Sequence, residues 1–144
     1  MFKYLSLTIF FFTSNILFAQ TLVEKRKSFI NSNLFDDNAD CYSYYSIQEE
    51  GLNRSKAYDK IDYKDLKVTF TKRAFNLGRE IGMKDEAIFS KIKISFDKQS
   101  KEIKSDFKNF SILAVKYGEF CNELFEKPDK RLAYWKDRAF KEIR

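Results

Sequence analysis

The chain has 144 residues and a net charge of +6, with 27 basic and 21 acidic side chains. These charges are interspersed, as on solvated helix faces, and no basic run is interleaved with stacking aromatics, so we expect no nucleic-acid partner. The chain contains no histidine, which excludes the usual histidine-dependent nucleophilic catalysis, zinc sites and haem ligation.

The N-terminal stretch is typical of a secretory signal peptide. Lys3 supplies the positive charge, residues 5–18 are mainly apolar, and Ala19 offers a small residue for cleavage. The apolar run is shorter than the ~20 residues of a bilayer span, although an uncleaved anchor is the alternative. We therefore expect a periplasmic or secreted protein, with signal peptide 1–19 and a single helical domain over 20–144.

Two short helices are predicted next. The first covers residues 21–31, and the polar stretch 31–33 should interrupt it because these side chains compete for backbone hydrogen bonds. Residues 36–38 are predicted to cap a second helix over 39–50, which should end near Gly51.

A longer helix is predicted from Ser55 to Ile81. Ala74, Gly78 and Gly82 lie four residues apart on it, and such a row of small residues lets another element approach closely. Gly82 is also the expected end of this helix.

The stretch from Asp85 to Leu124 is predicted to be one long amphipathic helix or two nearly collinear ones. A bend is expected at residues 108–111, and Pro128 should end the stretch before a final helix over 129–144. Steps of three, four or seven residues separate the apolar positions Ile92, Phe96, Ile103, Phe107, Phe110, Ala114, Tyr117, Cys121 and Leu124.

No strand pattern is found, so we predict an all-α protein: an elongated or bent up-down bundle built on a helical hairpin that turns at Met83. In that hairpin the Cys41 helix would continue the line of the 55–81 helix beside the long stretch. Cys41 and Cys121 would then lie near each other at its open end.

The two cysteines are expected to form a disulfide, because an exported chain meets an oxidising compartment. Two buried free thiols are the alternative. A bridge between Cys41 and Cys121 would close a loop of roughly 80 residues, for which the chain-entropy model gives about 4–5 kcal/mol as an upper figure.

Two groups of residues are candidates for binding. Tyr44 and Tyr45 share a helix face with Cys41 and would either pack in the core or face a ligand. The second group would either contact a partner protein or cover the core, and it comprises Arg131, Trp135 and Arg138.

Motifs for catalysis or cofactor binding are missing from the sequence. It has no glycine-rich phosphate loop and no Cys-x-x-Cys pair, and its acids suggest no particular catalytic pair. The acidic cluster at 36–40 lacks the glycine and terminal glutamate of a calcium loop, so capping explains it better. We expect no cofactor, no metal site and no enzymatic activity.

The pattern Cys41-x-x-Tyr44-Tyr45, then Tyr117-x3-Cys121 and Pro128-x2-Arg131-x3-Trp135, resembles small exported helical proteins of Gram-negative bacteria that carry no assigned function. The resemblance implies an all-helical, disulfide-linked periplasmic protein and transfers no activity.

The leading functional prediction is a non-catalytic binding or protein-interaction module whose partner is another envelope protein. The alternative is a carrier of an apolar or lipid-like small ligand within the helical bundle.

Overall fold

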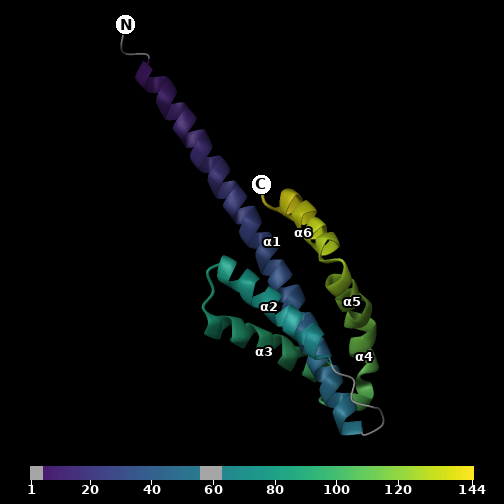
Figure 1. The fold of residues 1–144 in the computed structure, drawn as a ribbon. Helices are drawn as coiled ribbons and strands as arrows, with labels where there is room; N and C mark the ends of the chain where they lie inside the picture. The colour runs from purple at the N-terminus through teal and green to yellow at the C-terminus, as the bar shows by residue number, and fades with distance from the viewer. Residues whose placement is uncertain (1–4, 56–62) are drawn as a thin grey trace.

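The computed structural model describes the backbone of residues 5–55 and 63–144 and the side chains of residues 21–54 and 63–144. These residues form helices and turns and contain no strand, which confirms the all-α prediction (Figure 1). In chain order the elements are α1 (Leu5–Ser55), α2 (Lys64–Glu80), α3 (Asp85–Glu102), the 3-10 turn η1 (Phe107–Asn109), α4 (Ser111–Leu113), the π-helical turn η2 (Ala114–Gly118), α5 (Glu119–Glu126) and α6 (Pro128–Glu142).

Helix α1 runs without interruption, so the predicted break at residues 31–33 and the predicted end near Gly51 are wrong. Its polar side chains bond to carbonyls one turn earlier instead of ending the helix: Asn33 Nδ2 donates to Phe29 O at 2.8 Å and Asn38 Nδ2 to Leu34 O at 2.7 Å. Packing against other helices along α1 then outweighs the weak helix propensity of these residues.

The first part of α1 extends beyond the other helices in Figure 1. This part contains the segment predicted to be a signal peptide, and it is helical from Leu5 onward. Among the described residues, no helix combines the length and the apolar character needed to cross a membrane.

Helices α2 and α3 form the predicted hairpin, although the start of the predicted 55–81 helix lies partly outside the described residues. Gly82 makes the turn with a φ of +81°, a left-handed conformation that favours glycine. Gly78 is the close-approach position in the predicted row: a Cβ there would lie 2.7 Å from the Cδ1 atom of Ile88.

The Cys41 helix does not continue the line of α2. Instead α2 folds back alongside α1, and α3 also packs on α1 (Figure 1). The predicted arrangement is wrong because it requires one helix to end near Gly51 and the next to begin at Ser55, whereas α1 is helical through residues 51–55.

The long stretch breaks earlier than expected, between α3 and η1 rather than at residues 108–111. Lys104 and Ser105 both adopt a φ of 54°, in the left-handed region. Asp106 then caps η1, because its carboxylate accepts from Lys108 N at 3.0 Å. The break lets the chain turn back, so that α4, α5 and α6 run along the other side of α1 (Figure 1).

Candidate functional site

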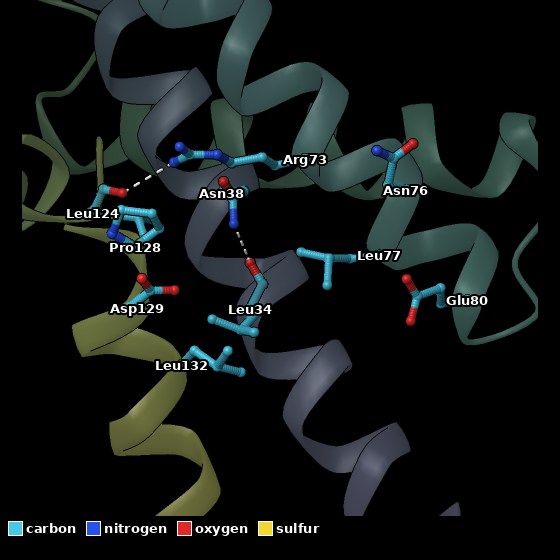
Figure 2. Close-up of a pocket in the computed structure, with 10 residues that line it drawn as sticks. All are labelled: Leu34, Asn38, Arg73, Asn76, Leu77, Glu80, Leu124, Pro128, Asp129 and Leu132. Carbon is cyan, nitrogen blue, oxygen red and sulfur yellow. Dashed lines mark hydrogen bonds between the residues drawn. The ribbon is translucent and has the colours of Figure 1, made fainter. Parts of the chain in front are cut away.

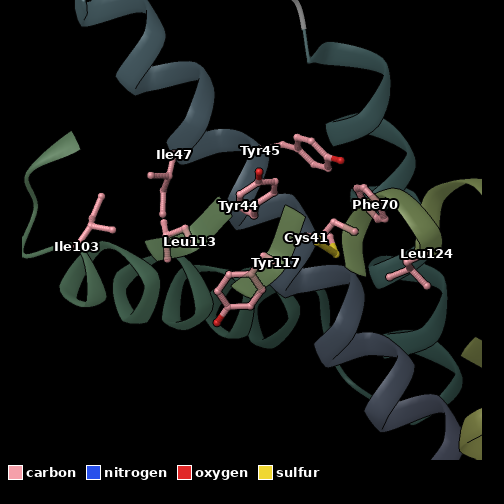
Figure 3. Close-up of a cluster of buried hydrophobic side chains, with 10 residues drawn as sticks. Cys41, Tyr44, Tyr45, Ile47, Phe70, Ile103, Leu113, Tyr117 and Leu124 are labelled. Atoms are coloured by element: carbon pink, nitrogen blue, oxygen red, sulfur yellow. A yellow bond between two sulfur atoms is a disulfide. The ribbon is translucent and has the colours of Figure 1, made fainter. Parts of the chain in front are cut away.

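A disulfide between Cys41 and Cys121 joins α1 to α5 and confirms the predicted pairing. Both residues are fully buried among apolar and aromatic side chains from α1, α2, α4, α5 and the turns between them (Figure 3). The buried cluster around the bridge comprises Tyr44, Tyr45, Ile47, Phe70, Ile103, Leu113, Tyr117 and Leu124.

Tyr44 and Tyr45 lie in this cluster, with exposed fractions of 5% and 3%. Tyr45 stacks on Phe70 and donates its hydroxyl hydrogen to Asn122 Oδ1 at 2.6 Å. Burial raises the pKa of Tyr45 to about 12 and also raises the pKa of Tyr44. The structure therefore places these two phenols in the core, and a ligand-facing role for them stays a prediction.

The predicted partner-binding group on α6 is divided by the fold. Arg131 forms a two-pronged ion pair with Asp37 of α1, with Nε–Oδ2 and Nη2–Oδ1 distances of 2.7 and 2.9 Å. Trp135 Nε1 donates to the same carboxylate at 2.6 Å. Arg131 and Trp135 therefore both bind the carboxylate of Asp37, and these bonds attach α6 to α1. A role for this group in partner binding stays a prediction.

Arg138 is not part of this attachment and pairs with Glu142 on the exposed side of α6. No local pattern indicates the partner of Arg131, since the sequence predicts that Asp37 caps a helix. In the structure Asp37 is an interior residue of α1 and is 9% exposed. Its hydrogen bonds with Arg131 raise the pKa of that guanidinium.

A pocket of about 230 Å³ opens between α1, α2 and the α5–α6 junction (Figure 2). Its wall is mainly apolar, and its polar lining groups come from each of the surrounding elements. The apolar lining residues are Leu34, Leu77, Leu124, Pro128 and Leu132, and the polar ones are Asn38, Arg73, Asn76, Glu80 and Asp129.

Two polar side chains of the pocket are incompletely paired: Asn38 Oδ1 lacks a hydrogen-bond donor, and Arg73 lacks a counter-ion. Asn38 is 2% exposed. Its Nδ2 atom donates to Leu34 O, but its Oδ1 atom accepts no hydrogen bond. Arg73 donates from Nη1 to Leu124 O at 3.0 Å and forms no ion pair with any described carboxylate. Burial without a counter-ion lowers the pKa of this guanidinium.

The two acids at the rim differ in their surroundings. Glu80 accepts from Asn31 Nδ2 at 2.9 Å and lies 3.6 Å from Lys27 Nζ. Asp129, in the first turn of α6, is exposed and has no cation partner among the residues that the structure describes. The rim therefore presents one unpaired cation, Arg73, and one unpaired anion, Asp129.

Sequence reasoning did not identify this pocket. Its lining comes from segments separated by up to about a hundred residues, and none of them forms a local motif. The available signal was Asn38, an amide in a helix interior. The sequence pattern instead predicts that Asn38 caps a helix beginning at residue 39.

Within the part of the chain that the structure describes, no group of three or more acidic or cysteine side chains is arranged to hold a metal ion. Comparisons with protein-family models, with curated proteins and with solved structures found no match. The resemblance to small exported helical proteins therefore stays a prediction, and the function is argued from the site alone.

Proposed function

We propose that this protein is an exported, non-catalytic binding protein that holds a small amphipathic molecule in the pocket between α1, α2 and α6. The pocket volume of about 230 Å³ lies just below the usual range of ~300–1,000 Å³ for drug-sized ligands. Its leucine-rich wall suits an apolar group, and its few polar groups would orient the bound molecule.

The observation that carries this proposal is the unpartnered Asn38 Oδ1. A buried acceptor without a hydrogen bond costs about 1–3 kcal/mol, so such atoms are uncommon unless they serve a purpose. In the part of the chain that the structure describes, the other buried side-chain polar atoms without a partner belong to Gln48, Gln99 and Tyr117, which do not line this pocket. Among the described residues, Asn38 is therefore the one buried side chain that has an unused acceptor and also lines this pocket.

Export is supported by the N-terminal segment and by the disulfide, since such bonds persist mainly in oxidising compartments. Binding to another envelope protein is the second candidate. On this fold it would use Arg138 and the neighbouring Tyr134, which is 44% exposed, because Arg131 and Trp135 are engaged with Asp37.

Saturation-transfer NMR with a library of small natural amphipathic compounds tests the ligand proposal. The variant Leu132→Trp should fill the pocket and abolish binding, since Leu132 lines it. Lys136→Trp adds the same side chain at an exposed position of α6 outside the pocket and should bind as the wild type does. If no compound binds the wild type better than the Leu132→Trp protein, the pocket is not the binding site.

A further inference from the structure

The unpaired charges at the pocket suggest what kind of molecule it takes. Figure 2 shows that Arg73 and Asp129 both lie toward the end of the pocket formed by Leu124 and Pro128. Leu77 and Glu80 lie toward the opposite end. A ligand would therefore place its charged groups at the first end and extend its apolar part past the leucines.

At the end of the pocket formed by Leu124 and Pro128, the protein offers both hydrogen-bond donors and acceptors, so a matching ligand has both an acceptor and a donor. The guanidinium of Arg73 is fixed by its bond to Leu124 O and retains further N–H donors for a carboxylate. Asn38 Oδ1 accepts no hydrogen bond and is covered by neighbouring protein atoms in this structure, and Figure 2 shows this oxygen on the side of the Arg73 head group. Asp129 is a carboxylate at the same end and accepts from a cation.

A ligand with a single charge does not suit this arrangement. A simple carboxylate would pair with Arg73 but would meet the negative charge of Asp129, and a simple amine would pair with Asp129 but would meet Arg73. Glu80 contributes little to the charge that a ligand would meet, because it already pairs with Lys27 and accepts a hydrogen bond from Asn31. A molecule with an ammonium and a carboxylate close together matches both unpaired groups.

We propose that the pocket binds a free apolar α-amino acid, of the size of leucine or phenylalanine. Its carboxylate pairs with Arg73, its ammonium lies between Asp129 and Asn38 Oδ1, and its side chain packs on Leu34, Leu77 and Leu132. This inference rests on the proposed function, since it names the ligand class of the same pocket.

Isothermal titration calorimetry with three compounds of similar apolar shape tests the inference. L-Leucine carries both charges, 4-methylpentanoate lacks the ammonium, and 3-methylbutylamine lacks the carboxylate. We expect leucine to bind about 10- to 100-fold more tightly than either analogue, which is the range for one hydrogen bond to a charged group. Leu132→Trp should abolish all three signals.

Two variants assign the contacts. Asp129→Asn, at an exposed position, should weaken leucine binding by about tenfold or more and leave 4-methylpentanoate unaffected or bound more tightly. Arg73→Gln should weaken the binding of leucine and leave 3-methylbutylamine unaffected or bound more tightly. Circular dichroism should confirm that this variant folds.

An analogue with one charge that binds as tightly as leucine would overturn the amino-acid assignment while leaving the pocket proposal intact. The absence of leucine binding at millimolar concentration would also overturn it. The library experiment on the Leu132→Trp protein decides the pocket proposal separately.

Discussion

Two successive segments of α1 differ in how the space beside the helix is filled. Around Cys41 the rings of Tyr44, Tyr45 and Phe70 pack closely, and a disulfide crosses the cluster. One to two turns earlier, at Leu34 and Asn38, the helix borders an open pocket. The same helix therefore supplies stability in one segment and a binding surface in the other, and substitutions should separate these two roles.

Removal of the disulfide should have the largest effect on stability. Replacing both Cys41 and Cys121 by serine releases a loop with a sequence separation of 80 residues. We expect the free energy of unfolding to fall by about 3–4 kcal/mol, measured by urea denaturation. A fall of less than 1 kcal/mol would show that the bridge contributes little and that the aromatic cluster holds α5 on its own.

Loss of the Asp37 attachment should have the next largest effect. Asp37→Asn weakens the ion pair with Arg131 and the bond from Trp135, and it leaves a partly buried guanidinium without its counter-ion. We expect a loss of about 2–3 kcal/mol in the free energy of unfolding.

The neighbouring Asp36→Asn is the matched control. Asp36 is exposed, and its ion pair with Lys91 is long, at 3.7 Å, and open to solvent. That variant should change stability by less than about 1 kcal/mol. Equal effects of the two substitutions would mean that the attachment of α6 does not depend on Asp37.

The buried phenol of Tyr45 predicts a loss of stability at alkaline pH. Its pKa is about 12 in the folded protein against an ordinary value of 10.0, so the folded state keeps this proton when the unfolded chain has lost it. The stabilisation is fully present below pH 10 and is lost as the pH rises from 10 to 12, by about 2 kcal/mol.

Denaturation at several pH values should show a shallower alkaline decline for Tyr45→Phe than for the wild type. At neutral pH this variant should cost about 1 kcal/mol through the lost bond to Asn122. The exposed Tyr134→Phe should keep the wild-type decline. If Tyr45→Phe declines as steeply as the wild type, the Tyr45 phenol does not drive the alkaline loss.

The helical class, the hairpin turn at Gly82 and the disulfide could be predicted because each has a local or compositional signal. Apolar spacing indicates the helices, glycine indicates the turn, and two cysteines in a chain predicted to be exported indicate the bridge. The continuity of α1 could not be predicted, because the side chains of Asn33 and Asn38 donate from Nδ2 to carbonyls one turn earlier only when tertiary packing holds the helix together.

The candidate site depended even more on tertiary structure. Neither the Asp37–Arg131 pair nor the pocket has a spacing that a single sequence reveals, since both bring α1 against α6 from opposite ends of the chain. The aromatic residues that the sequence predicts as binding candidates all have partners inside the protein: Tyr44, Tyr45 and Trp135.

The unfolding free energy of Asn38→Leu tests most directly whether Asn38 serves a ligand rather than the fold. The substitution removes a buried acceptor that has no partner together with the Nδ2 hydrogen bond to Leu34 O, and it adds apolar contact with the leucines of the pocket. Our account predicts that urea denaturation will give an unfolding free energy equal to the wild type or about 1 kcal/mol higher, in a protein that no longer binds leucine. A decrease of 1 kcal/mol or more, with ligand binding retained, would contradict it.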